Sequence, residues 1–198
     1  MNYQELKAAV SLYVHRKDLE PAFPVIMELA TNRIGRDTTL MELENNGTFY
    51  PDIEGEPIPL PTNYMRMVTV ATNSPHGKVS LEYFPPNQFS NLVMTGGRAY
   101  AYTIINNEIV TKPAASTLTL VWLEKPARLE NNADTNIILT NWFNLYFYGF
   151  LVETYVFLQN APALEAALQI YMAEVKACNK QADAARHSGA PLVMRGPS

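Results

Sequence analysis

The most constraining feature of the sequence is an apolar, aromatic stretch over residues 141–158, NWFNLYFYGFLVETYVFL. Extended back to Ile137, it reaches the roughly 20 residues that a membrane helix needs. However, Asn141, Asn144 and Glu153 would each need a partner in hydrocarbon, and no Lys or Arg flanks the stretch. We therefore expect no membrane span. A helix that is apolar nearly all round is expected where its own domain or neighbouring subunits cover several of its faces.

The aromatic side chains of this stretch would point round the whole helix circumference. For any single side chain, packing inside its own domain is the simpler interpretation, but for the set we expect some to contact other chains. Gly149 lowers helix propensity in the middle of the helix and suggests that another backbone approaches closely. The candidate residues for a subunit interface are Trp142, Phe143, Tyr146, Phe147, Phe150 and Tyr155.

Helical periodicity also appears at both ends of the chain. Apolar residues at helical spacing predict a helix over residues 3–15, and a second with Pro21 in its first turn and its end near Gly35. The short connection between them favours an antiparallel hairpin. After the aromatic stretch, Asn160 is expected to cap a last helix. Its predicted apolar face comprises Leu164, Leu168, Tyr171, Met172 and Val175.

Between these helical regions, about residues 38–124, the periodicity is that of strands. The runs TTLMELEN, YMRMVTVA, KVSLEYF, AYAYTII and TLTLVWL are rich in β-forming residues and are separated by Gly, Pro and Asn clusters. Residues 79, 81 and 83 are predicted to share one face of a strand, and residues 118, 120 and 122 another. PPNQF predicts a turn or short helix, INNEI a hairpin connection, and Asn46-Gly47-Thr48 a turn.

The predicted fold class is therefore α+β. It comprises an N-terminal helix hairpin, a small antiparallel sheet or sandwich, a long C-terminal helix pair and a flexible tail. Hydrophobic residues at 47% and charged residues at 17% indicate a globular chain. We expect a single domain over residues 1–185, in which helices at 3–36 and 136–185 flank the β region at 38–124. Residues 186–198 are expected to form the flexible tail.

The net charge, the cysteine content and the N-terminal sequence bear on nucleic-acid binding, on disulfides and on where the protein is made. A net charge of -4 provides no general field that would collect nucleic acid. Cys178, the only cysteine, cannot form an internal disulfide and is expected to be a buried structural thiol. The N-terminus does not resemble a secretory signal, so we expect synthesis in the cytosol.

Catalytic and metal-binding patterns are weak. His15, His76 and His187 share no spacing that would form a metal or base site. The acidic side chains of Asp52, Glu54 and Glu56 could project from one side of an extended segment, although such a run is more often a solvated strand face. We therefore expect no enzyme activity, catalytic residues, metal or cofactor.

The order of several phrases, from about residue 3 to about residue 178, resembles one protein family. The phrases are YQELKAAVSLYVHRKDLEPAFPVIMELATNRIGRD, LPTNYMRMVTV, LEYFPPNQF, YAYTIINNEIVTKPA, LTLVWLEKPARL and TNWFNLYFYGFLVETYVFLQNAPALEAALQIYMAEVKA. Together they are similar to the head-to-tail connector adaptor proteins of tailed bacteriophages, specifically the podovirus-type adaptor family.

This resemblance implies a structural protein of the virion, assembled in the host cytoplasm. Its subunits would form a ring, a dodecamer when docked, beneath the portal protein. The ring would extend the DNA channel, let DNA pass without specific binding, and present a docking platform to a downstream tail or nozzle protein. The basic and apolar groups near the C-terminus would order on the portal. The candidate portal-binding residues are Lys180, Arg186, Leu192, Val193, Met194 and Arg195.

Two other functions remain open at this point. The first is a small-ligand or carbohydrate-binding β module with helical flanks, in which the tyrosine and tryptophan side chains line a pocket. The second is a tail-associated hydrolase, which would need a convergent acid pair such as Glu54 with Glu82.

Overall fold

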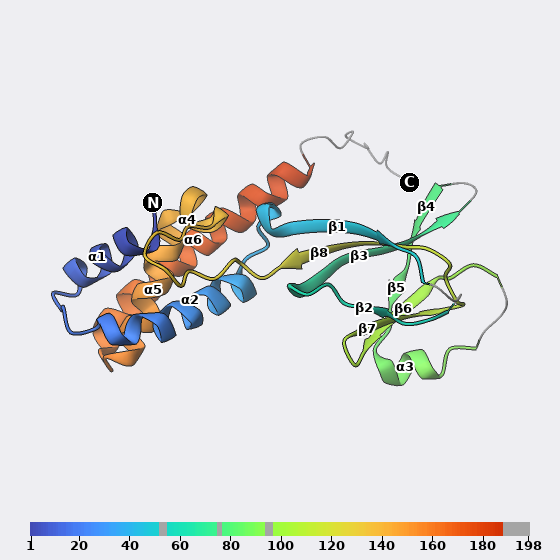
Figure 1. Cartoon of the computed structure of the whole chain (residues 1–198), viewed down its shortest axis with the longest axis horizontal. Helices are drawn as coiled ribbons and strands as arrows, with labels where there is room; N and C mark the ends of the chain where they lie inside the picture. Colours follow the sequence, from blue (N-terminus) through green and yellow to red (C-terminus); the bar gives the residue numbers. More distant parts are fainter. Residues whose placement is uncertain (52–54, 75–76, 94–96, 188–198) are drawn as a thin grey trace, which may run out of the picture. The chain divides into compact units, whose positions relative to one another are not determined.

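The computed structural model describes residues 1–51, 55–74, 77–93 and 97–187. The chain forms two compact units (Figure 1). The helical unit comprises Met1–Glu42 and Pro126–Ser198, and the β unit comprises Leu43–Lys125. The predicted α+β class, with helices at both ends of the chain and sheets in the middle, is confirmed. The single domain expected over residues 1–185 stays a prediction, because compactness alone does not show whether each unit folds independently.

The helical unit contains the expected N-terminal hairpin and C-terminal helix pair. Its elements are α1 (Tyr3–Tyr13), a 3-10 turn η1 (Glu20–Ala22), α2 (Phe23–Asp37), α4 (Ile137–Asn141), α5 (Phe143–Phe157) and α6 (Ala161–His187). Pro21 lies in η1, directly before α2, and α2 continues past Gly35 to Asp37. Asn160 accepts a hydrogen bond from the Ala163 amide at the start of α6, as predicted.

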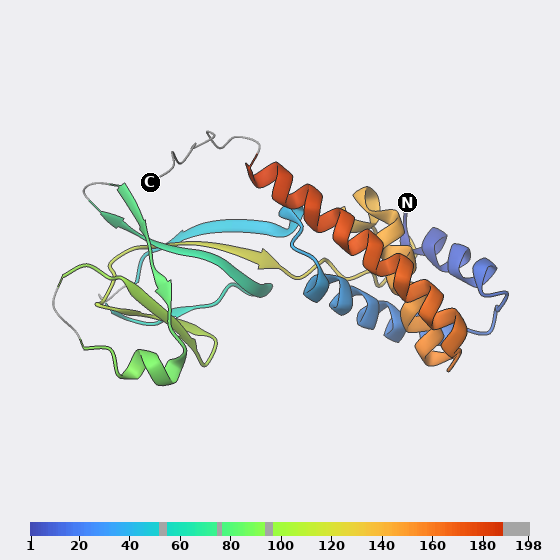
Figure 2. The same cartoon turned by 180° about the vertical axis from the view of Figure 1, so that it is seen from behind.

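The aromatic stretch comprises the last residue of α4 and all of α5, with a break at Trp142, whose φ of −130° and ψ of 51° are not helical. Helix α5 lies at the centre of the helical unit and packs against α1, α2, α4 and α6. Figure 2 shows α6 lying along α5 from the other side. The apolar circumference of α5 is therefore largely covered by helices of its own unit, because each neighbour buries a different stripe of it.

Gly149 marks the closest approach of side chains to α5. A Cβ atom built there would lie 3.3 Å from Cδ1 of Ile34 and 3.3 Å from Cε2 of Tyr171. The expected close approach is present, but it is made by side chains of α2 and α6 and not by another backbone. Both side chains are fully buried, so neither has free space into which it could move.

The β unit contains two four-stranded sheets. Its elements are η2 (Met41–Leu43, which begins in the helical unit), β1 (Glu44–Phe49), β2 (Ile58–Pro59), β3 (Tyr64–Ser74), β4 (Gly77–Ser80), β5 (Glu82–Tyr83), α3 (Pro86–Ser90), β6 (Ala101–Ile105), β7 (Glu108–Lys112) and β8 (Leu118–Glu124). The strand orders are β1-β8-β3-β4 and β2-β7-β6-β5. The pairs are antiparallel except β5 with β6, which are parallel, so the second sheet is mixed.

The chain passes from the first sheet to the second at Leu81, between β4 and β5. The Leu81 amide donates to the carbonyl of Val70 in β3, and the Glu82 amide donates to the carbonyl of Tyr100. Because of this change of sheet, the face predicted for residues 79, 81 and 83 is not continuous: Leu81 is buried, whereas Tyr83 is 50% exposed. The face predicted for Leu118, Leu120 and Trp122 is confirmed as part of the core.

Two dipeptides that contain asparagine were both predicted to form turns, but only one of them does. At 106–107, Asn-Asn forms the predicted hairpin turn, with φ of 52° and 63°. At 46–47, the predicted Asn-Gly turn is wrong, since both residues lie in β1 and pair with β8. A Cβ at Gly47 would lie 3.1 Å from Cε2 of Phe49 and 3.4 Å from Cη2 of Trp122. This glycine therefore makes room for aromatic rings and does not supply a turn.

One predicted strand begins later than expected. Residues 38–45 were predicted as a strand, but residues 38–40 are irregular, residues 41–43 form η2, and β1 begins only at Glu44. The physical reason is that Thr38 and Leu40 are fully buried in the helical unit, which holds this segment away from any sheet.

We predict that Gly149→Ala destabilises the protein despite the better helix propensity of alanine. The gain of about 1 kcal/mol in propensity is outweighed by overpacking against Ile34 and Tyr171, which costs about 1 to 3 kcal/mol. Thermal unfolding would show a lower Tm. The double variant Gly149→Ala with Ile34→Val, which lacks the Cδ1 atom, should recover part of the loss relative to Ile34→Val alone. A higher Tm for Gly149→Ala would contradict this account of the packing.

Candidate interaction surfaces

Three of the six residues predicted for a subunit interface are packed inside the helical unit. Tyr146 and Phe150 are fully buried, and Tyr155 is 8% exposed. The Phe150 ring packs on that of Phe23, with centroids 5.3 Å apart. In the free subunit these side chains are covered by neighbouring helices, so their assignment to an interface stays a prediction.

A buried polar network fixes Tyr146. Its hydroxyl lies 2.9 Å from Oγ1 of Thr31 and accepts a hydrogen bond of 3.0 Å from Nδ2 of Asn136. Burial raises the pKa of Tyr146, and the two hydrogen bonds oppose that shift. Because the hydroxyl has partners, a large tyrosine can occupy the middle of this core. The sequence did not indicate that Thr31 and Asn136 bind the Tyr146 hydroxyl, because they lie 115 and 10 residues away from it in the chain.

The only acidic residue of α5 is also satisfied within the unit. Glu153 is 8% exposed, and its Oε1 accepts a hydrogen bond of 2.6 Å from Nε of Arg33 on α2. A charge at this depth is tolerated only with such a partner. The ion pair therefore orients α5 against α2.

The other three predicted interface residues, Trp142, Phe143 and Phe147, are only half-buried. Phe147 is the centre of an aromatic cluster that spans α1 and α5. Its ring lies 5.6 Å from Tyr13, 5.7 Å from Phe143 and 5.3 Å from Tyr148, measured between centroids. We call Tyr13, Phe143, Phe147 and Tyr148 the aromatic ladder. Trp142 lies beside it in sequence, and its Nε1 donates to Oε1 of Glu42 at 3.1 Å.

The aromatic ladder has an accessible end. Tyr13 is 52% exposed and the preceding Leu12 is 75% exposed. Tyr13 is one of the apolar residues at helical spacing over residues 3–15, and that spacing gave no indication that it contributes to the surface. The only available signal was its position at the end of that helix, where coverage by a neighbouring helix also ends.

Helix α6 buries a different stripe from the one predicted. Tyr171 and Val175 are buried as expected, but Leu168 is 36% and Met172 54% exposed. The prediction favoured large side chains, whereas the packed stripe of α6 includes small ones that permit close approach. The buried residues are Ala167, Tyr171, Val175, Cys178 and Ala182.

A second set of exposed apolar side chains lies on α2 and α6, apart in sequence from the aromatic ladder. Val25 and Leu29 on α2 are 63% and 48% exposed, and Ile170 on α6 is 39% exposed. With Leu168 and Met172 these form what we call the α2/α6 apolar set. Both groups of side chains are large, apolar and accessible, which is typical of surfaces that meet other proteins.

The candidate portal-binding residues fall into two groups. Lys180 is exposed on α6, and Arg186 lies in the last turn of the same helix. Helix α6 extends to His187, past the predicted start of the tail at residue 186, and Nη2 of Arg186 donates to the Thr39 carbonyl at 2.9 Å. The flexible tail stays a prediction. Leu192, Val193, Met194 and Arg195 lie outside the described residues.

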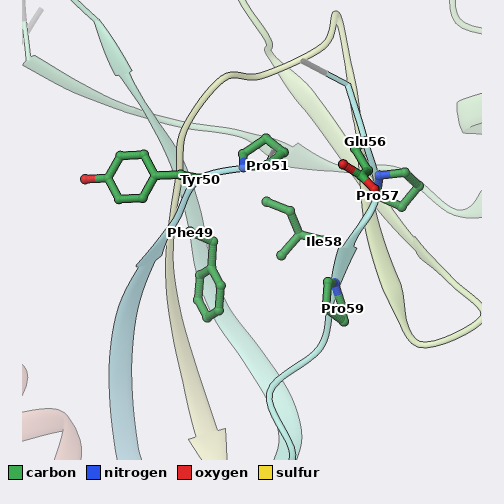
Figure 3. A pocket seen from close by; sticks show the side chains of 7 residues that line it. All are labelled: Phe49, Tyr50, Pro51, Glu56, Pro57, Ile58 and Pro59. Atoms are coloured by element: carbon green, nitrogen blue, oxygen red, sulfur yellow. The ribbon is translucent and has the colours of Figure 1, made fainter. Parts of the chain in front are cut away.

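The β unit has a small open pocket of about 210 Å³ near the end of β1 (Figure 3). Typical sites for small molecules have volumes of about 300 to 1,000 Å³. The Tyr50 ring points away from the other lining side chains (Figure 3). The pocket is lined by Phe49, Tyr50, Pro51, Glu56, Pro57, Ile58 and Pro59. It therefore offers little support for a ligand-binding module.

The acidic residues considered for metal binding or hydrolysis give no further support for either function. Asp52 and Glu54 lie outside the described residues, and Glu56 and Glu82 are exposed. Within the described part of the chain, no cluster of His, Cys, Asp and Glu side chains has the size needed to hold a metal ion.

The family model of the SU10 adaptor protein matches residues 1–195 of the chain. The chain belongs to the SU10 adaptor protein family. The predicted membership of the phage head-to-tail adaptor proteins is thereby confirmed. A comparison with curated proteins found no match. As members of an adaptor family, such proteins interact with other proteins of the phage capsid and tail. Among the described helices, none has both the length and the hydropathy of a membrane span.

We predict that Cys178 of this SU10 adaptor family member does not react with thiol reagents while the protein is folded. Burial, with Glu174 and Glu42 nearby, raises the pKa of the Cys178 thiol to about 12. The thiol is therefore protonated at neutral pH, and the thiolate that would react forms only as pH rises toward that value. The reaction with a disulfide reagent should be at least about a hundredfold slower than in guanidinium chloride. Equal rates in the two conditions would show that α6 opens readily.

Proposed function

We propose that this adaptor protein forms a ring beneath the portal of the virion, extends the DNA channel and provides the docking platform for the tail. The observation that carries the proposal is the aromatic ladder, which is left half-covered on a unit in which other aromatic side chains, such as Tyr146, Phe150 and Tyr171, are fully buried. Partial exposure of several adjoining rings costs solvation energy that a neighbouring subunit would recover. In the virion the neighbour would be a second copy of the chain.

A ring requires two different lateral faces on each subunit, because head-to-tail contacts close by rotation. The aromatic ladder would supply one face. Leu168 and Met172, which are one helical turn apart on α6, would contribute to the other face, since they are also apolar and exposed. The ring is proposed to be dodecameric when it is docked on the portal.

The charge of the chain suits a channel through which DNA slides. A net charge of -4 does not favour tight phosphate contacts across the whole surface. DNA is therefore proposed to pass without specific binding.

The C-terminal end would attach the adaptor to the portal. Lys180, Arg186 and Arg195 are proposed to pair with acidic portal residues, and the apolar triplet Leu192, Val193 and Met194 to enter a groove on the portal. A downstream tail or nozzle protein would then bind to the assembled ring.

We predict that Tyr13→Glu prevents ring assembly without unfolding the subunit. Tyr13 is 52% exposed, so the new charge is solvated in the free protein but would be buried against a neighbour. The measurement is the mass of the protein, alone and mixed with purified portal rings of the same phage, by native mass spectrometry. Tyr50→Glu, at a 72% exposed tyrosine of the β unit, is the matched control.

We expect the parent protein and the Tyr50→Glu control to add stepwise to the mass of the portal ring. Tyr13→Glu should not. Assembly of Tyr13→Glu at the parental level would remove the aromatic ladder from the interface. If the parent protein itself ignores the portal ring, the adaptor arrangement proposed above is wrong.

We predict that deletion of residues 188–198 weakens attachment to the portal and leaves the fold unchanged. The deletion removes Leu192, Val193, Met194 and Arg195 but keeps α6 through His187. Circular dichroism and Tm should match those of the full chain, whereas the fraction bound to portal rings should fall. A triple change of residues 192–194 to serine separates the apolar contribution from that of Arg195. Unchanged binding by the truncated protein would exclude the tail from portal attachment.

A further inference from the structure

The chain leaves the helical unit after α2 and returns to it before α4, and an asparagine side chain makes several of the hydrogen bonds that hold each of these two connections. The first connection follows Asp37 and leads toward β1. The side-chain amide of Asn179 on α6 binds this connection through both its oxygen and its nitrogen. Its Oδ1 accepts hydrogen bonds from the amide (2.8 Å) and the hydroxyl (3.1 Å) of Thr39, and its Nδ2 donates to the carbonyl of Asp37 (3.0 Å).

The second connection, which precedes α4, is held in the same way by Asn136. Its Nδ2 donates to the carbonyl of Ala127 at 2.9 Å, and its Oδ1 accepts from the Leu139 amide at 2.8 Å, which caps α4. The same Nδ2 also donates to the Tyr146 hydroxyl in the core. This connection is therefore tied to the fixed centre of the helical unit.

The first connection differs because its partners lie on the last turns of α6. In addition to Asn179, Arg186 donates from Nη2 to the Thr39 carbonyl at 2.9 Å. Nearer the middle of α6, the Tyr171 hydroxyl donates to Oδ2 of Asp37 at 2.9 Å. Thr39 thus has its amide, its hydroxyl and its carbonyl bound to α6.

Two of the three α6 side chains that bind this connection, Asn179 and Arg186, are partly exposed to solvent. Tyr171 is fully buried, whereas Asn179 is half-buried and the Arg186 side chain is 28% exposed. Arg186 also contacts Asp183 of its own helix, with Nη1 3.4 Å from Oδ1. The hold on Thr39 therefore depends on side chains that solvent or a partner can reach, in contrast to the hold on Ala127.

We infer that the last turns of α6 act as a clamp on the connection at Thr39, so that the state of this helix end controls the freedom of the β unit. With the clamp closed, the backbone of residues 37–39 is fixed to α6. With the clamp open, the connection from Thr39 to Leu43 keeps buried Leu40 and the hydrogen bond from Trp142 to Glu42, but it loses its bonds to Asn179 and Arg186. The β unit then moves more freely on its two connections.

The clamp also offers a way for binding at one end of the chain to affect the β unit. A partner with acidic groups would compete with the Thr39 carbonyl for Arg186, because a charged acceptor forms the stronger hydrogen bond. Docking of the α6 end would thereby loosen the connection. This consequence rests on the proposed attachment to the portal, but the clamp itself does not.

The test uses the full chain without any partner and compares Asn179→Ala and Arg186→Ala with the parent protein. Hydrogen exchange of the Thr39 amide is the direct measurement, because that amide donates to Asn179. Nitrogen-15 relaxation of β-unit amides reports how freely that unit tumbles. Gln181→Ala, at an exposed position on the same helix, is the matched control.

For Asn179→Ala we expect exchange at Thr39 to rise at least about tenfold, the change that loss of about 1.4 kcal/mol of protection produces. Arg186→Ala should raise it by a smaller factor, and both variants should shorten the rotational correlation time of the β unit. The helical unit and the control should be unchanged. If Asn179→Ala fails to fold, Arg186→Ala alone decides the outcome.

Two results would overturn the inference. One is parental exchange at Thr39 in the variants, which would mean that the hydrogen bonds of Asn179 and Arg186 do not hold the connection. The other is faster exchange without any change in β-unit tumbling, which would mean that the connection is loosened without consequence. Neither result depends on a portal, so failure of the clamp and failure of the proposed portal attachment can be distinguished.

Discussion

The helical unit depends on the burial of most of the circumference of α5. A helix without a polar stripe cannot lie at a surface, so α1, α2, α4 and α6 must surround it. Its few polar groups must also find partners inside the unit. The Tyr146 hydroxyl meets Thr31 and Asn136, and Glu153 meets Arg33. These long-range contacts bring the two ends of the chain together, and the β unit is inserted between α2 and α4 as a consequence.

This arrangement makes the two chain connections important. Because the β unit is an insertion, its only covalent links to the helices are the segments after α2 and before α4. Each is bound by an asparagine amide, which can donate and accept at once and so hold an irregular backbone. The two asparagines differ in how deeply they are buried. Asn136 lies at the core beside Tyr146, and Asn179 lies on the more accessible half of α6.

Membership of the SU10 adaptor protein family, together with the half-covered aromatic ladder, favours a structural protein that works by contact with other chains. The small pocket of the β unit provides no comparable argument for ligand binding. The aromatic ladder and the α2/α6 apolar set both belong to the helical unit, although Tyr50, Tyr83 and Val93 of the β unit are exposed as well. The proposed ring contacts are therefore assigned to the helices, and the β unit remains available for other partners.

Sequence patterns alone predict the number and order of the main helices, the alternating core strand at residues 118–124, the Asn106-Asn107 hairpin and the family. Local periodicity and turn chemistry are sufficient for these. Only the tertiary structure decided that Asn46-Gly47 lies in a strand, because the rings of Phe49 and Trp122 pack over Gly47. It likewise decided which aromatic residues are buried. A helix that is apolar all round has no stripe to orient it, so Tyr146 and Phe150 could be separated from Phe143 and Phe147 only by the helices that pack around them.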